Sequence, residues 1–495
     1  MTNQRVGRLA IVLHSHVPWL LGHGVWPVGE EWLRQAWAHS YIPLTAMLRE
    51  RAARGRTNLL TLGVTPVLAA QWDESSSIGE QERWIADWRI RATGKGIHAQ
   101  ATADSTAASD ARRHFRAAQW TMREFADHWR AGGSAALRPL VDAGAVELLG
   151  GPVTHPFTPH LLEPIADLAL ASGLADATVR VGKQPGGIWA PECAYTPGLE
   201  HLYRRHGVGH FVVDGPTLLA QRDSIHRPYR VGETDVVAFA RDLDLTYRVW
   251  SPRSGYPGNK WYQDFHSYDH DWGLHSSRVT RRSSEIKEPY QPQQASDQVR
   301  LDAHDFLTAA RTRMVDSCEA DPIVVVAYDT ELFGHWWHEG PQFLAAVLDT
   351  AHSYGIETTT LGRVAHEATE SVDLPPGTWG SGKDSRVWED GEAGHLRDRG
   401  RAAQYAVLDH LRRLPENWLA TRSPSADAIV TELLLALASD WAFMISKNSA
   451  ADYARDRSRD HFARLGDMLR TAHHNPAVTF EDTRLPFVDA RRAIR

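Results

Sequence analysis

The chain has 495 residues, of which 42% are hydrophobic and 23% charged, and its formal net charge is −7. This composition excludes a disordered chain, and the negative charge gives no electrostatic footprint for nucleic acid. One count is unusual: the 19 Trp outnumber the 13 Tyr and the 13 Phe, and 26 His accompany them. Because Trp is rarely fully buried, many indoles should be partly exposed, which favours a polar, flat-faced ligand.

The cysteines and the apolar runs bear on location. Cys193 and Cys318 cannot build a disulfide framework, which favours a reducing compartment. The apolar run that ends at His14 is too short for a signal or membrane segment, and the stretch over 433–445 is interrupted by Asp440. We therefore expect a cytoplasmic protein without a membrane partner, a monomer or a small homo-oligomer.

Short apolar runs alternate with amphipathic stretches along the first 360 residues. The predicted strands cover 9–13, 59–67, 145–149, 187–190, 210–213, 236–240, 323–327 and 356–361. The predicted helices between them include 32–51, 108–141, 196–206 and 340–354, and Thr196-Pro197 resembles a helix start. Continuous apolar runs are typical of strands buried on both faces. The alternation predicts an α/β fold with a parallel sheet closed into a barrel.

Two regions interrupt this pattern. Residues 250–300 are rich in Gly, Pro, Tyr, His and charge, which indicates a long insertion or lid over the strand ends. A disordered surface loop is the alternative, mainly for the second half of that region. After about residue 372 only helices are predicted, over 395–414, 426–446 and 453–474. We expect a catalytic domain at 1–372 and a helical domain at 373–495.

The first candidate site residues are histidines at strand ends. His14 and His16 lie on one face of the first strand, His155 follows another strand, and Asp329 ends a late one. In a barrel this set fits a metal-dependent amidohydrolase, in which zinc activates water. It fits equally well a set of hydrogen-bonding histidines without metal. No second HxH and no HExxH motif completes a metal site.

The segment 187–195, GIWAPECAY, places Glu192 directly after a strand and a proline. Trp189 and Tyr195 flank this glutamate. A buried ionisable carboxylate is costly unless it has a role. The structural alternative is an ion-paired glutamate at the start of the next helix.

The segment 324–341, VVVAYDTELFGHWWHEGP, supplies a second carboxylate. Asp329 ends a β-branched run and is followed by two indoles. A carboxyl group among aromatic rings can have a raised pKa and act as an acid near neutrality. Glu331 or Glu339 could be that acid instead, but Asp329 is favoured by its place at the strand end.

Two carboxylates on one barrel face, with His donors and Trp surfaces, are typical of a glycosidase. Five segments strengthen this interpretation, and together they resemble glycoside hydrolase family 57, most of all its α-1,4-glucan branching enzymes. They are residues 14–18 (HSHVP), 150–156 (GGPVTHP), 189–192 (WAPE), 328–335 (YDTELFGH) and 439–441 (SDW).

The resemblance implies an incomplete (β/α)7 barrel followed by a helical domain that closes the active-site cleft. It implies Glu192 as nucleophile and Asp329 as general acid/base. His14, His16 and His155 would hold the sugar whose bond breaks. The family members of this type need no metal and no cofactor, so we expect neither here.

Within the family, three features favour a branching enzyme over an amylase-type hydrolase or a 4-α-glucanotransferase. Residues 255–266 resemble the branching-enzyme lid, residues 378–388 resemble a sugar-stacking segment, and the C-terminal domain is helical. The partner would be a glycogen- or amylose-like α-glucan. The further substrate-binding candidates are Trp189, Arg241, Tyr256 and Trp261 in the lid, Trp336, Trp379, Trp388, Asp440 and Trp441. A non-catalytic glucan-binding protein remains a third hypothesis, beside the metal amidohydrolase.

Overall fold

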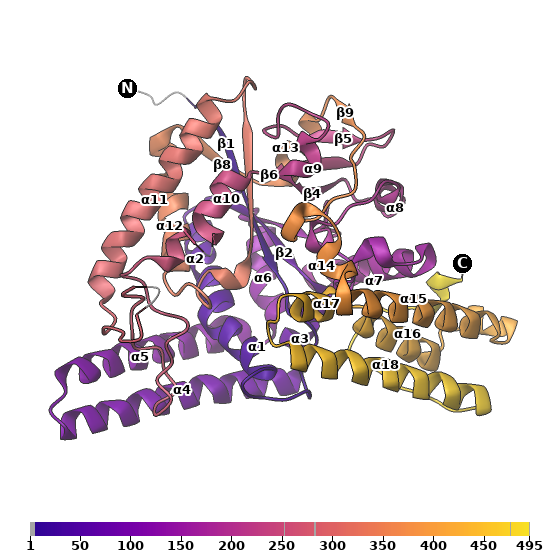
Figure 1. Ribbon diagram of the computed structural model, residues 1–495, viewed down its shortest axis with the longest axis horizontal. Coiled ribbons are helices and arrows are strands. Elements are labelled where there is room, and N and C mark those ends of the chain that lie inside the picture. The colour runs from indigo at the N-terminus through magenta and orange to yellow at the C-terminus, as the bar shows by residue number, and fades with distance from the viewer. Residues whose placement is uncertain (1–4, 252, 282–283, 476, 495) are drawn as a thin grey trace.

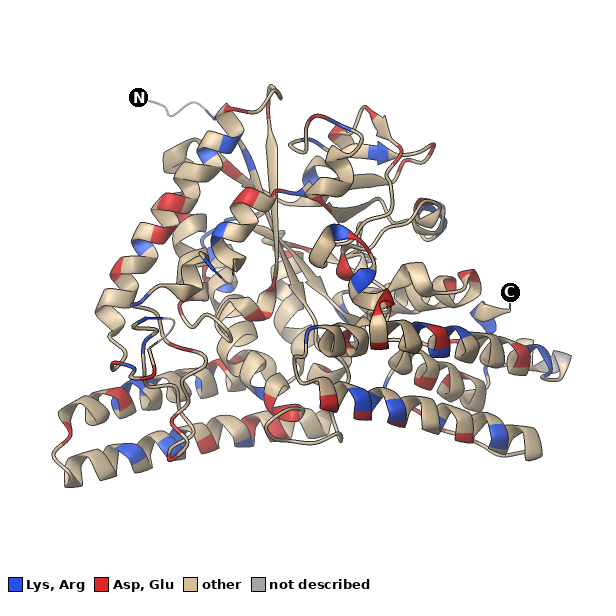
Figure 2. Cartoon of the chain, in the orientation of Figure 1, with Lys and Arg blue, Asp and Glu red and all other residues tan. Residues whose placement is uncertain are grey.

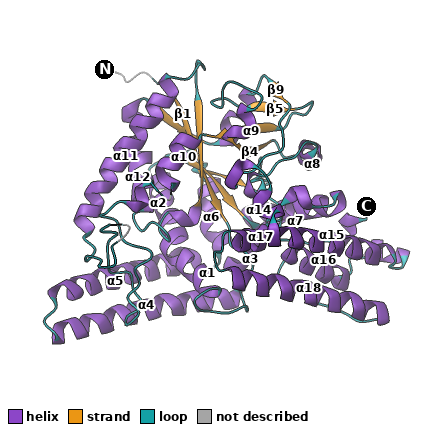
Figure 3. Ribbon diagram, in the orientation of Figure 1, coloured by secondary structure: helices purple, strands orange, loops and turns teal. Residues whose placement is uncertain are grey.

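The centre of the molecule is a set of mostly parallel strands surrounded by helices (Figures 1 and 3). The computed structural model describes residues 5–251, 253–281, 284–475 and 477–494. Its strands are β1 (Gly7–Ser15), β2 (Leu60–Val64), β3 (Val146–Leu149), β4 (His210–Asp214), β5 (Tyr229–Val231), β6 (Val237–Arg241), β7 (Ile323–Asp329), β8 (Ile356–Thr359) and β9 (Ser371–Val372). Most residues of β1, β2, β4, β6 and β7 are buried, as their continuous apolar runs predict.

The parallel strands close into a ring. The pairing runs β3-β2-β1-β7-β6, and β4 continues it beside β6. Two parallel bridges, Gly150 with Ile188 and Gly187 with His210, join β3 to β4. The predicted strand over 187–190 is therefore a seventh strand reduced to two bridges. The prediction of an incomplete (β/α)7 barrel is confirmed.

Strand β8 enters the ring at one end. It pairs with Gly7–Ala10 of β1, whereas β2 pairs with the following residues, Val12–Ser15, so β8 occupies the end of the barrel away from the strand termini that carry the polar residues. The short strands β5 and β9 extend the sheet outside the ring, and β5 is antiparallel to β6.

Helices cover the barrel and extend from it. They are α1 (Glu30–Ala36), α2 (Ile42–Ala53), α3 (Pro66–Asp73), α4 (Ser75–Ala101), α5 (Ser105–Glu124), α6 (Gly133–Asp142), α7 (Glu163–Val181), α8 (Leu199–Arg205), α9 (Gly215–Leu219), α10 (Leu243–Trp250), α11 (Pro292–Val315), α12 (Gly340–Thr350), α13 (Leu361–Val364), α14 (Arg386–Glu389), α15 (Gly391–Arg412), α16 (Pro424–Ala436), α17 (Ser439–Ser446) and α18 (Ala451–His474). No helix in the described ranges combines the length and apolar content that a membrane crossing requires.

Some predicted helices have different bounds. The helix predicted over 426–446 is divided into α16 and α17 at Leu437 and Ala438. The predicted helix over 108–141 is divided, because a π-helical turn at Phe125–Trp129 separates α5 from the segment that leads to α6. The predicted start at Thr196-Pro197 is wrong, since α8 begins at Leu199 after Gly198, whose φ of +104° interrupts the helical backbone.

The insertion between α10 and α11 is packed against the long hairpin of α4 and α5. The ammonium of Lys95, on α4, lies 2.9 Å from carboxylate oxygens of both Asp110 and Asp269 and donates to the hydroxyl of Ser276 at 2.6 Å. Asp269 and Ser276 belong to the insertion, so one buried cation connects it to both helices of the hairpin. Residues 252, 282 and 283 of the predicted lid lie outside the described residues.

The C-terminal helices share a hydrophobic core with the barrel. Val153 and Ile165 from the barrel side pack in one cluster with Val407 and Leu433 from α15 and α16. Figure 2 shows Lys and Arg interspersed with Asp and Glu along α15 and α18, without a face of one sign. The shared cluster shows that apolar packing joins the two regions.

We expect Lys95→Met to release the insertion from the hairpin. The substitution leaves the partly buried carboxylate of Asp269 without its cation, whereas Asp110 retains Arg113 at 2.6 Å, and breaking such a pair costs about 3 kcal/mol. Hydrogen exchange of residues 263–279 should become faster, and the melting temperature should fall by a few degrees. Lys260→Met, at an exposed lysine of the same insertion, is the matched control. Unchanged exchange in Lys95→Met would contradict this account of the clamp.

Candidate active site

The predicted polar residues meet at one rim of the barrel. His14 lies beside Asp329 in the register of β1 and β7, and beside Gly63 in the register of β1 and β2. Since parallel strands carry their carboxyl ends to the same rim, His14, Asp329 and the turn after the reduced seventh strand face a common space. Asp329 is the only residue of β7 that is not fully buried.

The turn that carries Glu192 has a strained backbone. Glu192 and Cys193 have φ values of +63° and +49°, in the left-handed region that is unfavourable for residues with a side chain. His155, on the loop after β3, has a φ of +57°. Each such residue costs about 1–3 kcal/mol, and such strain is concentrated at functional sites. The turn is held by a hydrogen bond from the backbone NH of Trp379 to the carbonyl of Glu192, at 2.9 Å.

The carboxylate of Glu192 accepts hydrogen bonds from two distant segments. The Ser439 hydroxyl donates to Oε1 at 2.6 Å, and the indole NH of Trp379 donates to Oε2 at 2.8 Å. Burial raises the pKa of Glu192 to about 7, while these two hydrogen bonds lower it. The nearby Asp440 carboxylate raises the pKa and His16 lowers it. The carboxyl group is thus poised to change its charge near neutrality.

Three histidines form a stacked layer beside this carboxylate. The ring of His155 lies 4.1 Å from that of His16 and 4.9 Å from that of His14, and Trp189 stacks on His14 at 4.7 Å. Burial lowers the pKa of His14 and His155 well below the ordinary value, so both rings are neutral near pH 7. Neutral imidazoles can donate to a sugar hydroxyl or accept from it.

The hydrogen bonds of the layer have a consistent direction when Glu192 is ionised. A carboxylate only accepts, so the Ser439 hydroxyl must donate its single proton to Glu192. The Ser439 oxygen can then accept from His155 Nδ1–H at 2.9 Å, and His155 Nε2 can accept from His14 Nε2–H at 3.0 Å. This assignment links Glu192 with three residues from three other parts of the chain around one negative charge.

Asp329 holds its proton more strongly than Glu192. Burial raises the pKa of Asp329 well above its ordinary value, the carboxylates of Glu331 and Glu192 raise it further, and Arg241 opposes them. The group therefore retains a proton near neutrality. A protonated carboxyl with some exposure, close enough to Glu192 to feel its charge, can act as a general acid.

The two alternative acids, Glu331 and Glu339, already accept hydrogen bonds from other parts of the protein. Glu331 accepts from the hydroxyl of Tyr41 and from the backbone NH of His16 at 3.2 Å. Glu339 has no exposed surface and accepts from the backbone NH of Gln263 at 3.1 Å, which fastens the insertion to α12. These contacts favour structural roles for both glutamates, and they favour the aspartate at the end of β7 as the acid.

Only one cluster of possible metal ligands occurs in the described ranges. Ligand atoms of His16, His155 and Asp440 lie within 4.8 Å of one another. His16 Nε2 contacts the Asp440 carboxylate at 2.9 Å, and its ring lies nearly parallel to that of His155. Ring nitrogens in parallel stacked planes do not converge on a tetrahedral centre, so this geometry suits hydrogen bonding better than zinc.

Arg241 and Trp379 lie at the site as expected. The Arg241 guanidinium is 5.3 Å from the ring centroid of Trp379, and Trp379 meets Trp189 edge to face at 4.9 Å. Trp379 is partly exposed, as a sugar-stacking indole must be. These two indoles and the guanidinium form one wall of the site.

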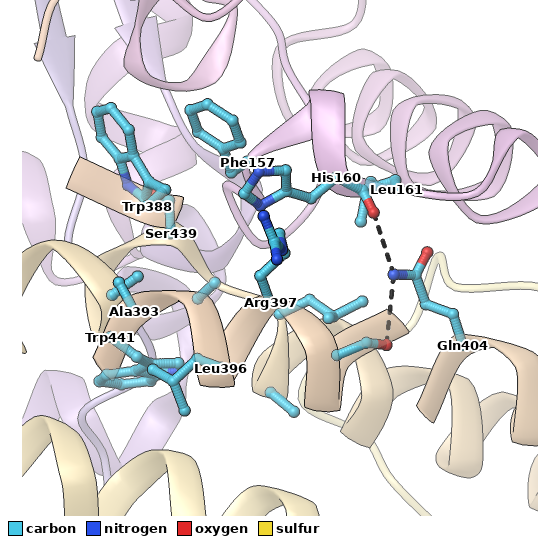
Figure 4. A pocket seen from close by; sticks show the side chains of 15 residues that line it. Phe157, His160, Leu161, Trp388, Ala393, Leu396, Arg397, Gln404, Ser439 and Trp441 are labelled. Carbon is cyan, nitrogen blue, oxygen red and sulfur yellow. Dashed lines mark hydrogen bonds between the residues drawn. The ribbon is translucent and has the colours of Figure 1, made fainter. Parts of the chain in front are cut away.

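Two predicted indoles, Trp388 and Trp441, are buried. Trp388 is 1% exposed and stacks on Phe157 at 4.7 Å, and Trp441 is 2% exposed and donates to the carbonyl of Leu435. Both line a small cavity between the loop after β3 and the C-terminal helices (Figure 4). The burial of Trp388 does not favour its expected role as a sugar-stacking surface, and Trp441 is packed in the same contact between the helices and the barrel.

The remaining predicted aromatic residues lie on the insertion side. The hydroxyl of Tyr256 donates to Asp305 at 2.6 Å, and Trp261 faces the guanidinium of Arg278 at 4.6 Å. Trp336 is 39% exposed. Among the described contacts, none joins these three rings to either candidate carboxylate. Tyr256 is packed and hydrogen-bonded here, and its role as the lid aromatic stays a prediction.

Sequence reasoning overlooked three residues that complete the site. Ser439 belongs to a recognised segment but was not assigned a role, although it donates to Glu192. Asp214 and Lys383 form an ion pair at 2.6 Å behind Trp379. The strand-end position of Asp214 was the available signal, whereas no local pattern marks Lys383.

Two family models match the chain. Residues 10–375 match the model described as glycosyl hydrolase family 57, and residues 401–487 match the model described as the C-terminal region of 1,4-alpha-glucan branching enzyme. The second match falls within the predicted helical domain.

Individual relatives agree with these models. A Mycobacterium tuberculosis protein named as a probable 1,4-alpha-glucan branching enzyme is 44% identical over 478 residues, covering 92% of this chain and 90% of the relative. The 1,4-alpha-glucan branching enzyme of Thermococcus kodakarensis is 32% identical over 512 residues, covering 94% and 74%. The crystal structure of the GH57-type branching enzyme from Pyrococcus horikoshii matches with a TM-score of 0.88 at 29% identity, covering 98% of this chain and 95% of that chain.

We expect Ser439→Ala to raise the pKa of Glu192. The lost hydrogen bond stabilises the charged form, so its removal shifts the pKa upward by about one unit. The carboxylate band can be followed with pH by infrared difference spectroscopy against the Glu192→Gln variant. Ser446→Ala is the matched control, because that hydroxyl lies on the same helix and donates to the carbonyl of Val387. A pKa that stays in place in Ser439→Ala would refute the assigned hydrogen bond.

Proposed function

We propose that this chain, which belongs to glycosyl hydrolase family 57, is a 1,4-α-glucan branching enzyme. The observation that carries the proposal is the pair of carboxyl groups at one barrel rim. Glu192 has a pKa near neutrality and Asp329 retains its proton more strongly, which suits a nucleophile and an acid. The match of residues 401–487 to the branching-enzyme C-terminal model favours branching over the other activities of the family.

The first step cleaves an α-1,4 bond. The ionised Glu192 attacks the anomeric carbon, and Asp329 gives its proton to the departing glycosidic oxygen. The fragment on the reducing side leaves, and the donor chain remains attached to Glu192 as a glycosyl ester. Substitution by a carboxylate inverts the anomeric centre once.

The second step forms the branch. Asp329, now a carboxylate, removes the proton from the 6-hydroxyl of an acceptor glucan as that oxygen attacks the anomeric carbon. The ester bond breaks, Glu192 regains its charge, and the product has an α-1,6 bond with net retention. If water attacks instead, the outcome is hydrolysis, so transfer requires a site that retains the acceptor and excludes water.

The surrounding residues would hold the sugar between the two carboxyl groups. We assign His14, His16 and His155 to its hydroxyl groups, because their rings form one stacked layer and offer nitrogen atoms for hydrogen bonding. Trp189 and Trp379 supply aromatic faces on which the apolar face of a sugar ring can stack. Arg241 and Asp440 are the charged neighbours, and both influence the pKa of Asp329.

The C-terminal helices would complete the cleft rather than form a separate unit. Ser439 donates to Glu192 and Asp440 contacts His16, so α17 supplies part of the site. We also propose a cytoplasmic location and a glycogen- or amylose-like substrate. The two free cysteines, Cys193 and Cys318, support the first of these.

The activity is tested by incubating the protein with amylose, then debranching the product and measuring chain lengths. New α-1,6 bonds without additional reducing ends support branching. Additional reducing ends without branches would replace the proposal with an amylase. Redistributed linear chains would replace it with a 4-α-glucanotransferase.

We expect Glu192→Gln and Asp329→Asn each to reduce transfer at least about a thousandfold, since each removes one reacting group. Circular dichroism should show that both variants remain folded. Glu331→Gln is the comparison for the acid. If Glu331→Gln abolished transfer while Asp329→Asn retained it, the acid would be wrongly assigned.

A further inference from the structure

A buried carboxylate, Asp214, lies behind the site and pairs with two cations. It stands at the end of β4 and has no exposed surface. Its Oδ1 accepts from Nε of Arg241 at 2.8 Å and lies 2.8 Å from Nη2 of the same residue, and its Oδ2 lies 2.6 Å from Nζ of Lys383. A buried carboxylate is costly unless it is paired, and this one is paired on both oxygens.

Lys383 belongs to a loop, residues 377–385, that we call the strap. Lys383 has a φ of +63°, in the left-handed region, so the backbone of the strap is strained at this lysine. Thr378 NH donates to the carbonyl of Lys383 at 3.2 Å, and Lys383 NH donates to that of Gly380 at 3.0 Å. The ammonium also donates to the hydroxyl of Tyr247 at 3.1 Å. The strap is thus a closed loop held by this cation, by the paired backbone hydrogen bonds between Gly377 and Tyr195, and by Lys447, which donates to the hydroxyl of Ser381.

The strap carries Trp379, which touches Glu192 twice. The backbone NH of Trp379 donates to the Glu192 carbonyl at 2.9 Å, and its indole NH donates to the carboxylate at 2.8 Å. The same ring lies over Arg241 at 5.3 Å. Arg241 supports the ring from β6 and Lys383 fastens the loop that bears it, and both cations are paired with Asp214.

We propose that Asp214 and Lys383 are positioning residues of the glucan-transfer site. By binding Arg241 and the strap together, Asp214 fixes the orientation in which Trp379 hydrogen-bonds the carboxylate of Glu192. Neither Asp214 nor Lys383 touches the reacting atoms. This inference rests on the proposed function, because it assumes that the charge on Glu192 drives the transfer.

Other charged groups also face Glu192, so the test must isolate the strap. Those groups are His16, His155, Asp329, Asp440 and, behind Trp379, Arg241. Lys383→Met keeps the length of the side chain and removes its charge, and Lys383→Arg retains the charge. Arg386→Met is the matched control, because this exposed cation follows the strap and pairs with Asp384. Trp379→Phe removes only the indole NH and part of the ring. It gives the largest shift in the pKa of Glu192 that the strap can produce.

We expect Lys383→Met to lower transfer about tenfold and to move the acid limb of the pH–rate profile upward, toward that of Trp379→Phe. Lys383→Arg should return the acid limb most of the way to its wild-type pH. Arg386→Met should leave the limb at that pH. The infrared pKa of Glu192 should move in the same direction. If Lys383→Met fails to fold, Lys383→Gln takes its place.

Two outcomes overturn the inference. If the pH–rate profile of Lys383→Met matches that of Arg386→Met, the ion pair of Asp214 and Lys383 does not act on Glu192. A slower enzyme with an unmoved acid limb and an unmoved infrared pKa would reduce the ion pair to a structural role. The infrared measurement needs no substrate, so a wild-type protein that transfers no glucan would refute the proposed function without deciding the inference.

Discussion

The site depends on the pair of hydrogen bonds received by the carboxylate of Glu192. The donors, Trp379 and Ser439, lie 187 and 247 residues further along the chain. Without them, burial would drive the carboxyl group toward its neutral form, and a neutral carboxyl is a poor nucleophile. The strained turn, the strap and the first turn of α17 can all be understood as supports for this one charge.

The two candidate catalytic carboxyl groups differ in what surrounds them. Glu192 receives neutral donors on both oxygens, which oppose the effect of burial. Asp329 has no such donors among the described hydrogen bonds and lies near the carboxylates of Glu192 and Glu331, so it holds its proton. Chemically similar groups thus acquire different ionisation from their contacts, as acid and nucleophile in one site require. The neutral rings of His14 and His155 add donors and acceptors without adding a charge that would disturb this difference.

The sequence reveals those parts of the molecule that local patterns encode. Continuous apolar runs predict the buried strands, and polar residues at their ends predict His14, Asp329 and Arg241 at one rim. The family resemblance also identifies the turn of Glu192. The sequence does not reveal whether Trp388 and Trp441 are exposed, because their exposure depends on how helices distant in sequence pack against the barrel. Lys383 is likewise unpredictable, because its role exists only once the strap meets β4.

The reduced seventh strand has a consequence for how the molecule can vary. A Cβ on Gly187 would lie 2.3 Å from Nε2 of His210, and that ring is held by Glu147 at 2.7 Å, so it has little freedom to move aside. The stretch that begins at Gly187 closes the barrel. Five residues further on, the same stretch carries Glu192. A substitution that displaces this stretch is therefore expected to displace the turn of Glu192 as well.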